Sequence, residues 1–310
     1  MGRLSMKRWV SVAIVATALM STTGHAADGV RVCGTIRLGE TTVATLQNAP
    51  VITLFANGAA VTLLLDTGAQ TTVLAPDAAE RIGARRPRVE SSREMQAIAG
   101  SLRTREVELQ SFTMGGVAMP LRRVRVAPLY VASAYSVRLD GVLGADTLSN
   151  FDIDIDLPGR HLVLYQKQTC AGAAPAWTGP YSRISAGRSL GDHLCFPAQL
   201  EGRSIVAFID TGAQFSVISK RAAAALAITD PVLARDPAMT VLGAAAEQLD
   251  GRVHRFSQLA IGTEVIRDPE IGVTDLRLSD ADLVLGVDFL QSRRVWMSYG
   301  SQQIFLSRRS

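Results

Sequence analysis

Short apolar runs recur along the chain and are separated by turns rich in glycine, proline and asparagine. Most runs are β-branched or alternate between apolar and polar residues, which is typical of strands. The expected strands are residues 51–55, 61–65, 124–126, 162–165, 205–209, 253–261 and 303–306. Helical signals are short: Pro76 opens one that runs to about Ile82, and an alanine-rich segment at 220–226 is its counterpart. The pattern predicts an all-β protein.

The chain carries an internal repeat. The pentapeptide DTGAQ occurs at residues 66–70 and again at 210–214, so the two aspartates are 144 positions apart (210 − 66). Apolar residues precede and follow both copies. Downstream, residues 140–146 correspond to 282–288, which places Gly144 78 residues after the first aspartate and Gly286 76 residues after the second. Two homologous lobes are therefore expected.

The repeat and the composition divide the chain into four parts. We expect a signal peptide at 1–26, an N-terminal lobe at 27–170, a linker at 171–190 and a C-terminal lobe at 191–310. The linker assignment rests on the glycine, alanine and proline residues around 171–180.

The first 26 residues resemble an export signal. Arg3, Lys7 and Arg8 precede the apolar run 9–20, and a polar stretch leads to a small-residue cleavage site after Ala26. An apolar run of this length is short for a membrane span, although an uncleaved anchor remains the alternative. We expect the mature protein in the periplasm or outside the cell, without stable membrane insertion.

The net charge and its distribution indicate no particular partner. The chain of 310 residues is 47% hydrophobic and 19% charged, and its net charge of +4 falls to +1 without the three cations of the signal. The basic residues are scattered and almost all are arginine. A nucleic-acid partner is not expected.

Three cysteines allow one disulfide and one free thiol. Cys33 opens the first lobe and Cys170 closes it, so we expect these two to pair across 137 residues (170 − 33). Cys195 in the second lobe would then stay reduced.

An aspartate at the end of an apolar strand is costly unless its charge is shared or hydrogen-bonded. A pseudo-twofold axis between the two repeats would bring Asp66 and Asp210 together. Two adjacent carboxyl groups share one proton, so one can accept a proton from water while the other protonates a carbonyl oxygen. The alternative is that each aspartate only holds its own turn, and the symmetric pair makes this the weaker interpretation.

These motifs resemble the aspartic proteases, and among them the retropepsin-like group. The resemblance covers residues 51–306 and implies two lobes of the acid-protease (pepsin/retropepsin-like barrel) fold, with Asp66 and Asp210 as the catalytic dyad. The residues that would support the dyad are Thr67, Gly68, Ala69, Thr211, Gly212 and Ala213. Gly144 and Gly286 would lie on the strand behind each catalytic turn.

By the same resemblance, residues 95–101 and 239–245 take the place of flaps, with Gly100 and Gly243 as flap glycines. The chain departs from relatives that are single lobes, because it carries both, and it lacks the flap tyrosine of pepsins. A monomer that cleaves an extended peptide or protein, with a catalytic water and no cofactor, is expected. The alternative is a catalytically silent module that binds a peptide in the same cleft.

Three other sequence patterns suggest functional sites, but each is less specific than the DTG repeat. Residues 187–191 match the GxSxG nucleophile motif without the strand and helix that it needs. Asp152, Asp154 and Asp156 imitate a calcium loop but lack its glycine and glutamate, so we expect a strand with one solvent-exposed face. The histidines show no metal-ligand spacing, and no metal site is expected.

Overall fold

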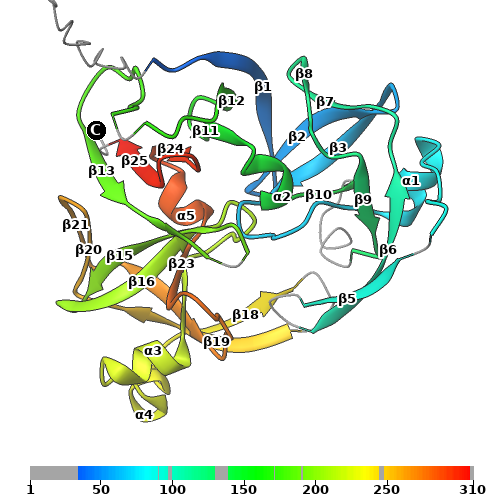
Figure 1. The fold of residues 1–310 in the computed structure, drawn as a ribbon. Coiled ribbons are helices and arrows are strands. Elements are labelled where there is room, and N and C mark those ends of the chain that lie inside the picture. Colours follow the sequence, from blue (N-terminus) through cyan, green and yellow to red (C-terminus); the bar gives the residue numbers. More distant parts are fainter. Residues whose placement is uncertain are drawn as a thin grey trace, which may run out of the picture. The chain divides into compact units, whose positions relative to one another are not determined.

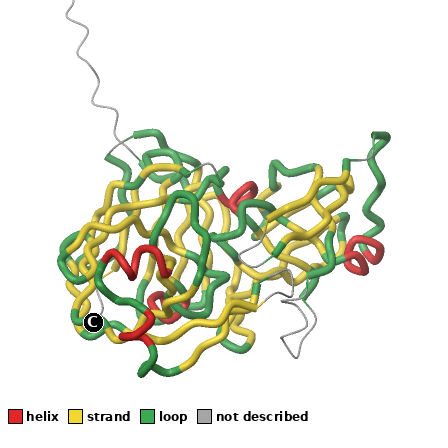
Figure 2. Tube along the Cα trace, turned by 90° about the horizontal axis from the view of Figure 1, so that it is seen from below, coloured by secondary structure: helices red, strands yellow, loops and turns green. Residues whose placement is uncertain are grey.

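The computed structural model describes residues 34–89, 91–96, 100–129, 139–170, 172–189, 191–243 and 248–307 (Figure 1). The predicted signal peptide and Cys33 lie outside these residues. Strands make up 50% of the structure and helices 9%, so the expected all-β class is confirmed (Figure 2). Among the described residues, no helix is long and apolar enough to cross a membrane.

The first half of the chain contributes twelve strands. They are β1 (Arg37–Leu46), β2 (Ala49–Ala56), β3 (Ala59–Leu65), β4 (Val73–Leu74), β5 (Ser92–Gln96), β6 (Ser101–Glu108), β7 (Phe112–Met114), β8 (Val117–Ala118), β9 (Arg123–Val126), β10 (Gly141–Leu143), β11 (Phe151–Asp156) and β12 (His161–Gln166).

The second half contributes thirteen strands. They are β13 (Tyr181–Ser185), β14 (Gly187–Arg188), β15 (Leu194–Leu200), β16 (Arg203–Ile209), β17 (Val217–Ser219), β18 (Ala238–Leu242), β19 (Gln248–Arg255), β20 (Gln258–Ile261), β21 (Glu264–Arg267), β22 (Glu270–Thr274), β23 (Leu283–Leu285), β24 (Arg294–Ser298) and β25 (Gln303–Ser307). The described helices are short: α1 (Pro76–Arg81), α2 (Ala145–Leu148), α3 (Lys220–Ala225), α4 (Asp230–Leu233) and α5 (Val287–Leu290).

The two halves repeat one strand order. In the first half, neighbouring strands run β2-β3-β10-β4-β9-β6-β5, and in the second half β15-β16-β23-β17-β22-β19-β18. The directions also agree, because β3 pairs with β10 and β16 with β23 in parallel, whereas β10 pairs with β4 and β23 with β17 antiparallel. The two expected homologous lobes are therefore present.

A third set of strands joins the lobes. We call it the central sheet, and its order is β13-β25-β24-β11-β12-β1. Its middle pair is β11 of the first half with β24 of the second, in register from Asp152 opposite Ser298 to Asp156 opposite Arg294. Strand β13 lies inside the segment expected to be the linker, and it pairs with β25.

The expectation that β11 has one solvent-exposed face is wrong. Asp152 and Asp154 are both fully buried. Backbone amides of Gln168 and Gly300 donate to Asp152 at 3.0 and 3.3 Å. The guanidinium of Arg294 donates to both oxygens of Asp154 at 2.8 and 2.7 Å. Hydrogen bonds to the charged form allow these carboxylates to lie inside the sheet.

The expected strand at 253–261 is divided between β19 and β20. Ser257 leaves the ladder because its amide donates to the side chain of Glu201 at 2.6 Å, and its hydroxyl donates to the same carboxylate at 2.6 Å. The other strand and helix expectations agree with the structure to within a few residues at each end.

One apolar core extends through both halves. It includes Leu63 of β3, Ile153 of β11, Ile209 of β16 and Ile304 of β25, none of which is more than 1% exposed. Because β3 and β16 end in this core, the residues that follow them emerge from buried, fixed backbone. Those residues are the two DTG turns.

Candidate active site

Each DTG turn follows a buried strand and lies beside the end of a parallel neighbour. The backbone amide of Asp66 donates to the carbonyl of Leu143 at 3.1 Å, and that of Asp210 donates to Leu285 at 2.9 Å. Strands β10 and β23 therefore fix the first residue of each turn. The side chain of Asp210 is buried at 3% exposure, and Asp66 is partly buried.

Both carboxylates accept hydrogen bonds from their own turns. Oδ1 of Asp66 accepts from the amides of Gly68 at 3.0 Å and Ala69 at 2.7 Å. Oδ1 of Asp210 accepts from the amide of Gly212 at 2.8 Å. Such bonds orient each carboxylate and favour its charged form.

The threonines link the two turns through a reciprocal network. The amide of Thr67 donates to Oγ1 of Thr211 at 3.1 Å, and the amide of Thr211 donates to Oγ1 of Thr67 at the same distance. Each hydroxyl then donates to a backbone carbonyl of the opposite half, Thr67 to Ile209 at 2.8 Å and Thr211 to Leu65 at 2.6 Å. All four groups are buried, so the turns are held together away from solvent.

The glycines of the two turns allow this approach. A β-carbon placed on Gly68 would lie 2.2 Å from Cγ of Asp210, and one on Gly212 would lie 2.4 Å from Cγ of Asp66. Any side chain at either position would clash with the opposite carboxylate. The backbone of each turn thus encloses the aspartate of the other.

The environment favours a shared proton. Burial raises the pKa of both aspartates. For Asp66, the negative charge of Asp210 and a hydrogen bond between the two carboxyl groups raise the pKa further. For Asp210, that same hydrogen bond lowers the pKa. Two carboxyl groups in this relation titrate as a pair, which keeps one proton where isolated aspartates are fully ionised.

Gly144 and Gly286 lie immediately behind the turns, directly after β10 and β23. A β-carbon on Gly144 would lie 2.8 Å from the carbonyl oxygen of Ala69, and one on Gly286 would lie 2.8 Å from that of Ala213. These contacts leave no room for a side chain at either glycine.

A hydroxyl residue that follows each DTG turn is hydrogen-bonded to a second aspartate. Thr72 donates to Asp146 through its amide and its hydroxyl at 2.9 and 2.6 Å, and its Oγ1 accepts from the amide of Gly144 at 3.1 Å. Ser216 does the same with Asp288, at 2.9 and 2.8 Å. Thr72 and Ser216 were not among the predicted site residues, although two hydroxyl residues 144 positions apart fit the repeat.

The glutamine of each DTGAQ motif reaches the opposite half. Nε2 of Gln214 donates to the carbonyl of Gln47 at 3.2 Å. The side chain of Gln70 packs on Gly191, where a β-carbon would lie 2.5 Å from Nε2. Positions 47 and 191 are themselves 144 apart. The two glutamines therefore make equivalent contacts with the opposite halves, which explains why glutamine is repeated in both motifs.

The flap candidates lie at the turns of two equivalent hairpins. Strands β5 and β6 pair up to Gln96 opposite Ser101, and β18 and β19 pair up to Leu242 opposite Gln248. Gly100 has a φ of 78° in the first turn. Gly243 begins the second turn and is buried. Residues 97–99 and 244–247 lie outside the described residues.

An apolar cluster accompanies each hairpin. In the first half, Ala69 and Met95 pack against a cluster that includes Leu102. In the second half, Ala213 and Met239 pack against the corresponding cluster around Phe208. Each hairpin therefore shares an apolar cluster with the alanine that follows a DTG turn.

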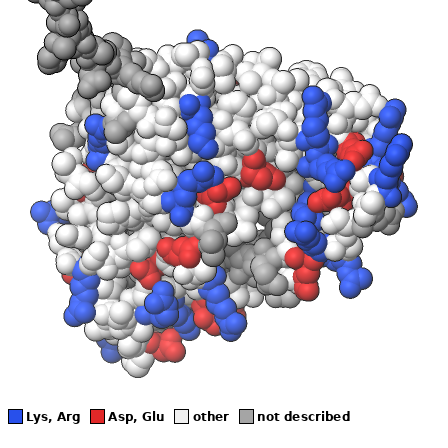
Figure 3. Space-filling model, in the orientation of Figure 1, with Lys and Arg blue, Asp and Glu red and all other residues white. Residues whose placement is uncertain are grey.

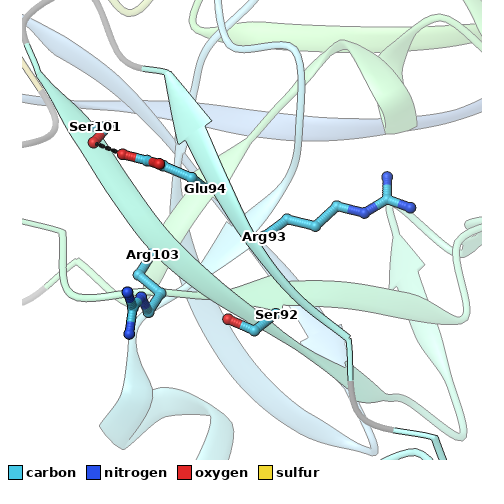
Figure 4. A pocket seen from close by; sticks show the side chains of 5 residues that line it. All are labelled: Ser92, Arg93, Glu94, Ser101 and Arg103. Atoms are coloured by element: carbon cyan, nitrogen blue, oxygen red, sulfur yellow. Dashed lines mark hydrogen bonds between the residues drawn. The ribbon is translucent and has the colours of Figure 1, made fainter.

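The solvent side of the first hairpin is polar. A pocket of about 450 Å³ lies between its exposed side chains. Ser101 donates to Glu94 across the hairpin at 2.5 Å, and Figure 4 shows this pair with the other lining side chains. The lining residues of the pocket are Ser92, Arg93, Glu94, Ser101 and Arg103. None of them belongs to the DTG turns, so this pocket is separate from the aspartates.

Ser189 of the GxSxG match holds a turn. Its Oγ accepts from the amides of Gly191 and His193, both at 3.2 Å. The described residues 191–193 lead directly into strand β15 at Leu194, whereas a nucleophile turn requires a helix there.

The cysteines differ in state. Cys170 is disulfide-bonded and Cys195 has a free thiol. Cys33, the predicted partner of Cys170, lies outside the described residues.

On the molecular surface, basic side chains are spread over the visible face with acidic side chains between them (Figure 3).

Comparison with known families agrees with this geometry. Residues 49–147 match the family described as aspartyl protease, and residues 196–292 match the family described as gag-polyprotein putative aspartyl protease. Each match contains one DTG turn. A comparison with curated proteins found no match. With one such unit in each half, the chain belongs to the retropepsin-like aspartyl proteases.

Proposed function

We propose that this protein is an exported aspartic endopeptidase whose catalytic dyad is Asp66 and Asp210. The observation that carries the proposal is the interlocked pair of turns, in which the glycine of each turn lies against the carboxyl group of the other and the threonines link the two. Its location rests on the export signal expected at residues 1–26. Both halves of the site come from one chain, so the active form is a monomer.

A water molecule held between the two carboxyl groups is the nucleophile of the proposed reaction. The ionised aspartate takes a proton from this water as its oxygen attacks the carbonyl carbon of the peptide bond. The protonated aspartate gives its proton to the carbonyl oxygen, and a tetrahedral diol forms. When the C–N bond breaks, the proton taken from water passes to the leaving nitrogen, and a hydroxyl proton returns to the other aspartate. No cofactor is required.

The substrate class is an extended peptide with apolar side chains on both sides of the cleaved bond. Ala69 and Ala213 support this, because each lies three residues after an aspartate, is partly exposed and packs against an apolar cluster. Apolar surface favours apolar side chains by removing them from water. The hairpins of β5–β6 and β18–β19 would cover the peptide from the other side.

Substitution of each aspartate tests the proposal. Asp66→Asn and Asp210→Asn keep the size of the side chain and remove the acid–base group, so each variant should lose at least about a thousandfold in kcat/KM. The measurement is hydrolysis of a peptide library by the purified mature protein, with the cut ends sequenced. Circular dichroism on both variants would show that the fold persists.

Two results would contradict the proposal. Substantial hydrolysis by either variant would exclude the dyad, and activity lost on dilution together with a dissociating dimer would exclude the single-chain site. If the wild type binds peptides without cutting them, and Asp66→Asn binds equally well, the protein is the silent peptide-binding module instead.

A further inference from the structure

The two aspartates have unequal surroundings. The internal repeat places His193 in the second half opposite Ala49 in the first, 144 residues earlier. Ala49 is the first residue of β2 and is 1% exposed. His193 lies just before β15, the strand equivalent to β2. A titratable ring therefore stands in one half where the other half has a methyl group.

The ring of His193 lies against the strand that carries Asp210. It stacks on the ring of Phe208 with the centroids 5.1 Å apart and the planes 9° from parallel. Phe208 precedes Asp210 by two residues on β16. The backbone of Gly68, the glycine whose α-carbon faces the carboxylate of Asp210, also acts on the imidazole and raises its pKa.

His193 has few other partners. Its Nε2 atom is shielded from solvent and has no hydrogen-bond partner among the described residues. The charged groups that face the ring are Asp210, Asp192 and Asp280, and Asp192 is paired with Arg188. Burial lowers the pKa of His193, and the three carboxylates oppose that effect, Asp210 most strongly. The interaction is mutual, since His193 lowers the pKa of Asp210.

We propose that His193 is a positioning residue that makes the dyad asymmetric, holding the negative charge on Asp210 and leaving the shared proton on Asp66. This inference rests on the proposed function. Asp210 is then the base that takes the proton from water, and Asp66 is the acid that protonates the carbonyl oxygen. In a symmetric pair either aspartate fills either role.

The first test needs no substrate. The pKa of His193 is measured by NMR titration of its ring in the wild type, Asp66→Asn and Asp210→Asn, with the resonance identified by its loss in His193→Gln. Asp210→Asn removes the facing charge, so the pKa should fall by about half a unit or more. Asp66→Asn leaves that charge in place, so the pKa should stay the same or rise. Equal changes in both variants would overturn the inference.

The second test is the pH dependence of kcat/KM in His193→Gln. Wherever the ring is protonated, its positive charge favours ionised Asp210, which extends activity to lower pH. Removing the ring should move the acid limb to higher pH by roughly half a unit. His161→Gln is the matched control, because His161 pairs with Asp156 on β11 and should leave the profile unchanged.

The two tests separate this inference from the proposed function. If the protein hydrolyses no peptide, the function fails, whereas the NMR comparison still decides whether His193 senses Asp210. If hydrolysis is found but the acid limb of His193→Gln coincides with that of the wild type, the dyad is catalytic and the assignment of an asymmetric role to His193 is wrong.

Discussion

The closest steric constraint in the site is set by two residues without side chains. Gly68 and Gly212 each bring backbone against the carboxylate of the opposite half, at distances that exclude a β-carbon. Neither glycine has a positive φ. Space, rather than backbone conformation, therefore dictates glycine at both positions.

Gly68→Ala or Gly212→Ala should separate the turns. The extra methyl group forces the backbone away from the opposite aspartate, which should cost about 1–3 kcal/mol in the free energy of unfolding. Misplacing the carboxyl groups by about 1 Å should lower kcat/KM roughly a hundredfold. Peptide hydrolysis and urea unfolding measure the two effects.

Gly187→Ala is the control, because a β-carbon there meets no atom within 4 Å. Its stability and activity should match the wild type. Wild-type activity in Gly68→Ala would show that the turns are not packed as closely as described.

At the scale of elements, the central sheet depends on an ion pair inside it. Strand β24 supplies Arg294, which holds Asp154 of β11 by two hydrogen bonds, and Nε1 of Trp177 donates to the same carboxylate at 3.0 Å. Asp154 is completely buried, so its charge has no access to water. The pairing of β11 with β24 is thus stabilised by an ion pair as well as by apolar packing.

Arg294→Met should weaken this junction strongly. Removing one partner of a buried pair leaves an uncompensated charge and should cost about 3–5 kcal/mol, measured by denaturant unfolding. Arg255→Met removes an exposed pair with Glu270 and should cost far less. A second substitution, Asp154→Asn, should recover part of the loss in Arg294→Met. Equal costs for the two arginine variants would refute this account.

At the scale of the whole molecule, the halves form one cooperative structure. The central sheet takes strands from both halves, the apolar core is continuous, and the threonine network crosses between the turns. Thermal unfolding of the full chain should therefore give one transition by tryptophan fluorescence, and loss of hydrolysis should follow the same curve. Two separated transitions, or activity lost well before the fluorescence change, would show that the halves unfold independently.

Much of this architecture could be predicted from the sequence, because the repeat reveals both lobes and both DTG turns at once. Features that depend on pairing between distant strands could not. The residues around Asp154 in the sequence do not indicate that it is buried, because its partner Arg294 lies 140 residues away. The role of His193 could not be predicted for a different reason. The repeat identifies residues that the two halves share, whereas His193 corresponds to Ala49 and so differs between them.

The interlocked turns also determine when the proposed site first forms. Neither turn alone encloses a carboxyl pair, because Gly212 covers Asp66 and Gly68 covers Asp210. During synthesis, a ribosome that has completed only the first DTG turn has made half a site. The second turn follows 144 residues later, so the pair of carboxyl groups forms only after both turns have docked. A nascent or truncated chain with one DTG turn therefore has no enclosed carboxyl pair of its own.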